Sequence, residues 1–316
     1  LCDAVSGRIE SQITLETLQH RNLFVISLDD ERRWFRYHHL FADALRQRLQ
    51  QAQPDLIPEL HRRASAWFEQ NALMTEAIQH ASAATDFQRA AQLIEQAALL
   101  WLPGGAETLR SMIDALPAEL VRARPRLDVI YCWVLGLTGQ PDRVEARLDE
   151  IEQEVAAADE LPDRNSILGE ITALREQLAL NSNRPLDSDE LRNALINVPE
   201  HSLRVRSMLT VMLGYAEREA GHLAAATRIY AEASLLAQKQ ADVFVAVSAL
   251  VALAELLEVQ GQLHQAAQTH RQAIRLATTR TGRPLPLAGI AHVGLGKQLR
   301  EWNDLEEATL HLPEGI

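Results

Sequence analysis

Residues 213–237 read LGYAEREAGHLAAATRIYAEASLLA, and residues 253–277 read LAELLEVQGQLHQAAQTHRQAIRLA. The two stretches align without a gap, and residues 295–316, LGKQLREWNDLEEATLHLPEGI, align with both. The copies are about 40 residues apart, which lies in the range of α-helical repeats. Apolar and small residues recur at helical spacing on both sides of a central Gly or Asn. The sequence therefore predicts a repeated pair of helices.

The predicted turn between the paired helices is marked by Gly221, Gly261 and Asn303, which align in the three copies. Gly and Asn are the residues that most readily adopt the left-handed backbone of such a turn. Gly214 and Gly296 lie in the first helices, where a small residue lets two helices approach closely. This pattern is that of a tetratricopeptide repeat (TPR), although the period exceeds the usual ~34 residues. We therefore expect lengthened helices.

After Pro54, every segment with a periodic pattern of apolar residues has the period of a helix. We predict an all-α fold here, a TPR-like superhelix over residues 54–316. Pro313 conflicts with a regular last helix, which we expect to kink or fray. The predicted helices cover residues 58–70, 73–84, 87–101, 106–115, 124–138, 141–158, 164–181, 187–197, 203–220, 223–239, 242–260, 263–280, 285–301 and 304 onward.

The first 53 residues have a different pattern. Residues 8–20 have helical spacing, whereas residues 23–28 and 34–37 are rich in β-branched and aromatic side chains and predict a β-hairpin. Helical spacing returns at His38. Helix, hairpin and helix in this order are typical of the end of a winged helix. We predict that residues 1–53 are the C-terminal part of a winged-helix domain.

Charge and composition limit the possible partners. The net charge of −12 disfavours direct nucleic-acid binding. A winged helix can enter a major groove, but we interpret the arginine cluster in this region as part of an intramolecular packing module. No apolar run is long enough for a membrane span and no signal peptide is present, so we expect a cytoplasmic protein with no membrane partner. The arginines of that cluster are Arg32, Arg33, Arg36, Arg46 and Arg48.

We find no pattern of catalytic or metal-binding residues. The G-x-x-x-x-G-K-[ST] loop of ATPases is absent, as are H-E-x-x-H and G-x-S-x-G. Histidines at helical positions are expected to be surface or partly buried side chains rather than metal ligands, because zinc needs several convergent ligands. We therefore predict a chain that is not an enzyme and holds no metal or cofactor. These histidines are His61, His80, His264 and His270.

Three stretches resemble one family: residues 27–49, SLDDERRWFRYHHLFADALRQRL; residues 59–96, which begin ELHRRASAWFEQ; and residues 108–127, TLRSMIDALPAELVRARPRL. They are similar to the MalT-type regulators, also called the large ATP-binding LuxR-family regulators, within the STAND class of signal-transduction ATPases. The resemblance covers almost the whole chain. The first two stretches are fairly specific, whereas helical repeats alone are generic.

The resemblance implies an ATPase with its winged helix, then a repeat sensor, then a LuxR-type helix-turn-helix. The ATPase would precede Leu1 and the DNA-binding domain would follow Ile316, so we expect a fragment of a longer protein in which ATP or ADP binds. The expected function is that of an effector-sensing arm, which binds a small inducer or a regulatory protein. The alternative is a generic TPR scaffold for a peptide or protein partner, without nucleotide dependence.

The same resemblance suggests one nucleotide-sensing residue. STAND proteins carry a Met-His-Asp-Leu motif in the winged helix, and residues 37–40, YHHL, fall in the matching context. His38 matches the His that contacts a nucleotide phosphate, whereas Tyr37 and His39 depart from the motif and have no assigned role. The alternative is that His38 only packs against its neighbours and caps a helix.

The turn residues also give a register for the predicted groove. Polar positions of the first helices are expected to face it and to contact a ligand or partner. The alternatives are a solvated groove without ligand and a hidden enzyme whose residues come from distant helices. The predicted groove residues are Tyr215, Arg218, Glu255, Glu258, Lys297 and Arg300.

Overall fold

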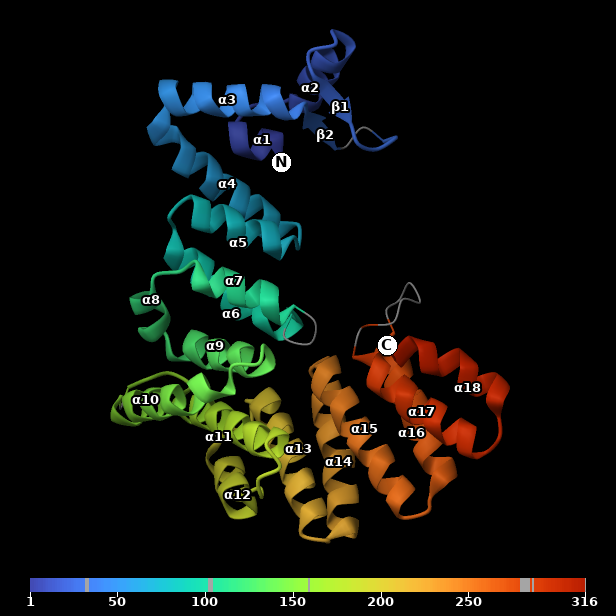
Figure 1. Ribbon diagram of the computed structural model, residues 1–316. Helices are drawn as coiled ribbons and strands as arrows, with labels where there is room; N and C mark the ends of the chain where they lie inside the picture. The colour runs from blue at the N-terminus through green and yellow to red at the C-terminus, as the bar shows by residue number, and fades with distance from the viewer. Residues whose placement is uncertain (32–33, 102–104, 159, 279–284, 286, 316) are drawn as a thin grey trace. The chain divides into compact units, whose positions relative to one another are not determined.

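The computed structural model describes residues 1–315 except 32–33, 102–104, 159, 279–284 and 286. Two arginines of the predicted cluster, Arg32 and Arg33, lie outside the described residues, and so does the end of the helix predicted for 263–280. The chain forms two compact units, which are described separately: residues 1–99 with 111–127, and residues 100–110 with 128–316. Figure 1 shows their helices.

The first unit begins with the predicted helix, hairpin and helix. The two strands pair antiparallel, with Val25 opposite Tyr37 and Ser27 opposite Phe35. The first strand begins later than predicted, because Phe24 directly before it adopts a positive φ of 58°. The elements are α1 (Cys2–Ser6), α2 (Ser11–His20), β1 (Val25–Ser27), β2 (Phe35–Tyr37) and α3 (His39–Ala52).

The rest of the described chain is helical, which confirms the all-α prediction. Most predicted helices begin and end within three residues of the observed ones. The short α8 has no prediction because five residues are too few to show a period. The helices are α4 (Ile57–Gln70), α5 (Met74–Ala83), α6 (Phe87–Trp101), α7 (Ala106–Asp114), α8 (Ala118–Arg122), α9 (Pro125–Leu137), α10 (Val144–Ala157), α11 (Arg164–Asn181), α12 (Ser188–Asn197), α13 (Leu203–Glu219), α14 (Leu223–Gln238), α15 (Val243–Val259), α16 (Leu263–Leu276), α17 (Ala288–Glu301) and α18 (Leu305–His311).

The helices of the second unit pack in antiparallel pairs, α13 with α14, α15 with α16, and α17 with α18 (Figure 1). The turns of these pairs have φ of 81° at Gly221, 75° at Gly261 and 59° at Asn303, so the predicted positions of the turns are confirmed. As expected for a turn-like residue, Pro313 ends the regular structure: α18 stops at His311 and a 3₁₀ turn follows.

The paired helices approach most closely at the two predicted glycines. A Cβ on Gly214 would lie 2.5 Å from the ring of Tyr230, and a Cβ on Gly296 would lie 2.7 Å from the side chain of Leu312. Both distances are shorter than van der Waals contact, so any side chain there would displace its neighbour. The core beside them is built largely of alanine and leucine, in line with the low aromatic content of 5%.

Within the described ranges, no helix is both long and apolar enough to cross a membrane.

Gly261→Val is expected to lower the free energy of unfolding by at least about 1 kcal/mol, because a β-branched residue is strained at φ 75°. The matched control is Ala241→Gly. Ala241 occupies the turn between α14 and α15 at φ 57°, so glycine should relieve strain there and raise the melting temperature. Urea unfolding of both variants provides the measurement. Equal stability of Gly261→Val and the parent chain would contradict the turn assignment.

Candidate functional site

The hairpin of the first unit exposes an apolar face. Alternate residues of the first strand and its flanks point outward: Phe24 is 58% exposed, Ile26 48% and Leu28 56%. Trp34, whose carbonyl accepts a hydrogen bond from the Leu28 N–H, directly precedes the second strand and is 47% exposed. A row of large apolar side chains on one side of a hairpin is the kind of surface that other domains cover.

His38 lies at one end of this hairpin and at the start of α3. Its backbone N–H donates to the Phe24 carbonyl at 2.8 Å, which continues the strand pairing. Its exposed ring lies 4.4 Å from the His39 ring and makes no capping hydrogen bond to α3. The capping alternative is therefore not seen, and the ring remains accessible beside the N-terminus of a 14-residue helix.

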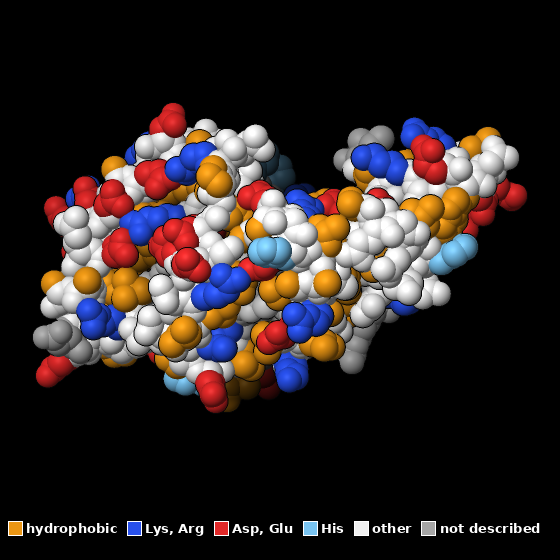
Figure 2. Space-filling view, turned by 90° about the horizontal axis from the view of Figure 1, so that it is seen from below, with side chains coloured by type: hydrophobic (Ala, Val, Ile, Leu, Met, Phe, Trp, Pro, Cys, Tyr) orange, Lys and Arg blue, Asp and Glu red, His pale blue; other side chains and the backbone are white. Residues whose placement is uncertain are grey.

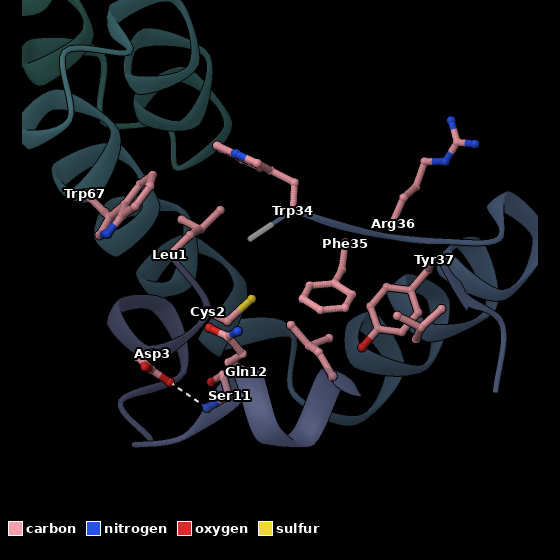
Figure 3. Close-up of a pocket in the computed structure, with 12 residues that line it drawn as sticks. Leu1, Cys2, Asp3, Ser11, Gln12, Trp34, Phe35, Arg36, Tyr37 and Trp67 are labelled. Atoms are coloured by element: carbon pink, nitrogen blue, oxygen red, sulfur yellow. Dashed lines mark hydrogen bonds between the residues drawn. The ribbon is translucent and has the colours of Figure 1, made fainter. Parts of the chain in front are cut away.

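A cavity of about 460 Å³ lies beside the hairpin. In Figure 3, Phe35 and Tyr37 point into it, while Arg36 points away from them. Among the lining residues, Asp3 accepts a hydrogen bond from the Ser11 N–H at 2.8 Å (Figure 3). Burial raises the pKa of Tyr37. The walls are Leu1, Cys2, Asp3, Ser11, Gln12, Leu15, Val25, Trp34, Phe35, Arg36, Tyr37 and Trp67.

Three predicted groove residues form one cluster in the second unit. Arg218 of α13 pairs with Glu255 of α15 at 3.4 Å, and its guanidinium lies 5.0 Å from the centre of the Tyr215 ring. Tyr215 in turn meets Tyr230 edge to face, at 5.4 Å between ring centres. Burial raises the pKa of both tyrosines. The cluster thus connects neighbouring repeats through a cation, an anion and two aromatic rings.

Two further groove residues, Glu258 and Lys297, lie in the neighbourhood of a buried histidine. Glu258 lies 3.3 Å from Nε2 of His270, and Lys297 is near enough to act on the pKa of Glu258, which burial raises. His270 is only 1% exposed, so the expectation of a surface or partly buried imidazole was wrong. Three helices enclose it, and a Cβ on Gly294 of α17 would lie 2.3 Å from its ring. Burial lowers the pKa of His270 to about 4.

The sixth groove residue, Arg300, is exposed and pairs with its neighbour Glu301 at 3.0 Å. The two buried residues of the clusters, Tyr230 and His270, were not predicted. Each has a buried polar atom without a protein partner, Oη of Tyr230 and Nδ1 of His270. They lie nine residues after the turn glycines of their repeats, so an alignment of the second helices would have paired them.

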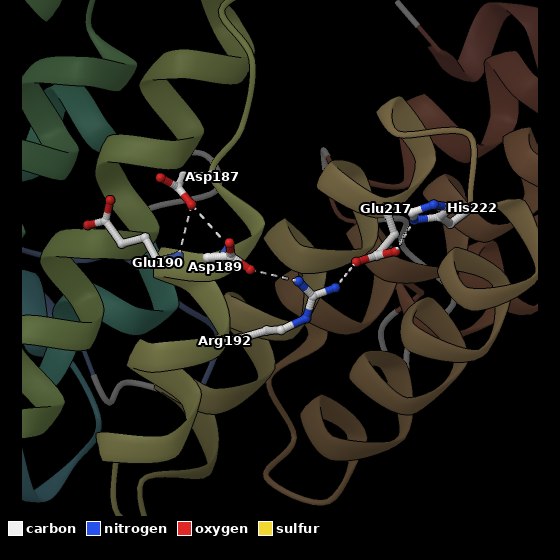
Figure 4. Close-up of polar contacts among 6 residues, drawn as sticks. All are labelled: Asp187, Asp189, Glu190, Arg192, Glu217 and His222. Carbon is white, nitrogen blue, oxygen red and sulfur yellow. Dashed lines mark hydrogen bonds and ion pairs between the residues drawn. The ribbon is translucent and has the colours of Figure 1, made fainter.

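A second polar cluster holds α12 against α13. Glu217 is 5% exposed and accepts hydrogen bonds from Arg192 and, at 2.8 Å, from Nδ1 of His222 (Figure 4). Arg192 also pairs with Asp189 at 3.3 Å. A buried carboxylate group needs such partners, because burial without them is costly. The cluster therefore fixes the turn between α13 and α14 relative to α12.

Arg192→Met is expected to lower the free energy of unfolding by about 1 kcal/mol. The loss stays below that of a fully buried pair, because Arg192 is half-exposed and His222 still contacts Glu217. Arg228→Met, on the exposed side of α14, is the control and should change stability little. Thermal unfolding of the two variants decides the point, and equal losses would show that Glu217 does not depend on Arg192.

The described part of the chain contains no group of three His, Cys, Asp or Glu side chains able to hold a metal ion. On the face seen in Figure 2, basic and acidic side chains are interspersed with hydrophobic ones. A nucleic-acid-binding face usually gathers its Lys and Arg in one patch.

Comparison with known proteins gives two family matches. Residues 1–57 match the MalT winged helix domain. Residues 169–316 match the MalT-like TPR region. The first match contains the hairpin and His38, and the second contains all six predicted groove residues.

Named relatives extend the similarity to nearly the whole chain. The HTH-type transcriptional regulator MalT of Cronobacter sakazakii is 30% identical over 96% of this chain, and that of Serratia proteamaculans is 29% identical over 99%. The serine/threonine-protein kinase PknK of Mycobacterium tuberculosis is 34% identical over 63% of this chain.

The chain spans only part of these relatives: 34% and 35% of the length of the two regulators and 18% of the kinase. The two family matches, the hairpin between two helices and the repeated helix pairs agree with one another. The chain belongs to the MalT-type family, of which it carries the winged helix and the TPR region.

Proposed function

We propose that this chain is the sensing and signal-transmitting arm of an ATP-dependent transcription activator in the cytoplasm. One observation carries the proposal: the same kind of region occurs in relatives named as transcription regulators and in a relative named as a protein kinase. A region shared by proteins with different activities is better suited to receiving a signal than to carrying out either activity. The ATPase and the LuxR-type DNA-binding domain would belong to the rest of the protein in cis.

The input is proposed to be a small inducer or a regulatory protein that contacts the first helices α13, α15 and α17. Two properties of these helices support it. The cluster of Tyr215, Arg218 and Glu255 offers charge of both signs beside an aromatic ring. The Arg218–Glu255 pair joins neighbouring repeats, so a ligand that replaces it would change how they pack. Such a change transmits a signal only if the ligand prefers one arrangement.

The winged helix is proposed to contact the ATPase domain through the apolar hairpin face, with His38 toward the nucleotide. The sequence has no phosphate-binding loop, so ATP or ADP would be held by the ATPase domain. His38 and the free backbone N–H groups at the start of α3 suit contact with a phosphate. When bound, the nucleotide supplies phosphate oxygens that an imidazole N–H can contact, and loss of that contact would free the hairpin face.

The groove proposal is tested by calorimetry of this chain against panels of sugars, metabolites and short peptides. Arg218→Ala and Glu255→Ala should each weaken binding of any hit at least about tenfold, whereas the control Arg228→Ala on α14 should not. A hit that is a peptide, with no response of the full-length protein to nucleotide, would favour the TPR scaffold instead. Equal effects of Arg218→Ala and Arg228→Ala would contradict the groove assignment.

The nucleotide proposal has a separate test. We expect no ATP hydrolysis by this chain alone, and measurable turnover by pure material would contradict that. In the full-length protein, His38→Ala should speed release of a fluorescent ADP analogue, while His39→Ala serves as the neighbouring control. Identical release rates for the two variants would remove His38 from the proposed contact.

A further inference from the structure

Three helix pairs carry a polar side-chain pair at the same place. Counted from the turn residue with positive φ, one partner lies eleven residues before it and the other eight residues after it. Each pair therefore joins the first helix of its helix pair to the second. The pairs are His61 and His80 about Ala72, Asp128 and Arg147 about Gly139, and His292 and His311 about Asn303.

The two histidine pairs share one geometry. Nδ1 of His61 lies 2.7 Å from Nδ1 of His80, and Nδ1 of His292 lies 2.9 Å from Nδ1 of His311. The ring centres are 5.0 Å apart in both. A hydrogen bond between two ring nitrogens needs one N–H and one lone pair, so at least one ring must be neutral. When both rings are protonated, two N–H groups face each other and the bond is lost.

The groups around His292 and His311 only partly favour the binding of a second proton by this pair. His292 is 8% exposed, and burial together with His311 lowers its pKa against the attraction of Glu314. Glu307 lies 4.0 Å from Nε2 of His311, but this carboxylate also accepts a hydrogen bond from Arg271 of α16 at 2.9 Å. Its charge is thus shared with a permanent cation.

The first pair has comparable surroundings. His80 stacks on Phe68 at 5.2 Å between ring centres, so an apolar ring covers one of its faces. Burial and His61 lower the pKa of His80, and Glu76 acts in the opposite direction. In both pairs a single shared proton is compatible with the contact, whereas a second proton is opposed by burial and by the partner ring.

We propose that His61–His80 and His292–His311 are proton-sensitive clasps, which hold α4 to α5 and α17 to α18 at neutral pH and release them when both rings are protonated. The Asp128–Arg147 pair occupies the same position in α9–α10 and contains no imidazole, so that helix pair serves as the internal control. The clasps do not depend on the proposed sensing function. The local stability of these two helix pairs therefore falls on mild acidification.

Hydrogen exchange of this chain, followed by mass spectrometry at about pH 7.5 and about pH 5, tests the proposal. After correction for intrinsic exchange rates, protection of α4–α5 and α17–α18 should fall at least about tenfold more than protection of α9–α10 and α13–α14. A fall of the same size in all four helix pairs would overturn the proposal. So would a response that a chelator abolishes, because a metal ion would then join the rings.

A matched variant places the pair of α9–α10 into α17–α18. His292→Asp combined with His311→Arg should reduce the acid response of α17–α18 to the part that His270 contributes, and leave that of α4–α5 intact. The milder His311→Gln covers the case in which the double variant does not fold. In nitrogen-15 spectra of the rings, the intact pair should titrate in two separated steps, and His292 in His311→Gln should titrate in one. A single step in the intact pair would also overturn the proposal.

Discussion

Gly214→Ala is expected to lower the free energy of unfolding by about 2 kcal/mol, although alanine is the better helix former. The added Cβ would lie 2.5 Å and 2.6 Å from two ring carbons of Tyr230. That ring is fully buried against Ala226, Ala252 and Leu256, so it has no free space into which to move. Overpacking should therefore outweigh the gain of about 1 kcal/mol in helix propensity. Urea unfolding measures the difference.

Gly136→Ala provides a control of opposite sign. Gly136 lies inside α9, and a Cβ there would meet Leu178 at 3.5 Å, which is ordinary contact. Alanine should therefore stabilise that helix by about 0.5 to 1 kcal/mol. The double variant Gly214→Ala, Tyr230→Leu should lose less stability than the sum of the losses of the two single variants. The reason is that the smaller leucine side chain removes the clash. Strict additivity would mean that the ring does not lie over Gly214.

Acidification is expected to cost about 3 kcal/mol of stability through His270 alone. Its pKa is about 4 in the folded chain, whereas an imidazole in the unfolded chain has its ordinary value of 6.5. The unfolded state then binds the proton more tightly, so the contribution is complete above pH 6.5 and is lost as the pH falls toward 4. Burial causes the shift and outweighs the attraction of Glu255.

His270→Gln isolates this contribution, since glutamine retains a polar side chain but does not titrate. The free energy of unfolding, measured by urea between pH 7 and pH 4, should decline less steeply in the variant than in the parent chain. The curves should therefore converge as the pH falls. Parallel curves would show that His270 is not held neutral in the folded chain.

The turns show how far the sequence predicts the fold and where it stops. Gly221 and Gly261 were recognisable because glycine adopts positive φ without strain. Ala72 and Ala241 adopt the same conformation at φ 58° and 57°, but alanine gives no sign of it in a sequence. Packing of the flanking helices imposes that backbone, so only the structure reveals these turns.

The candidate site divides in the same way. Periodicity and turn register were enough to predict that Arg218 and Glu258 lie on first helices, because only the local helix decides that. The burial of His270 depends on α15, α16 and α17 together, and no local pattern encodes three helices. For His38, the change from strand to helix spacing predicted its position between β2 and α3, whereas its phosphate contact stays a prediction.

The single left-handed residue in the turns at Gly221, Gly261 and Asn303 limits how this chain tolerates change in length. Each residue of a helix rotates its successors by about 100°, so one inserted residue before Gly261 would turn the later half of α15 away from α16. Substitutions on exposed positions leave that geometry intact. Among homologous genes, deletions and insertions should therefore be confined to the connections between helix pairs, and the spacing from Gly221 to Tyr230 should vary less than the residues themselves.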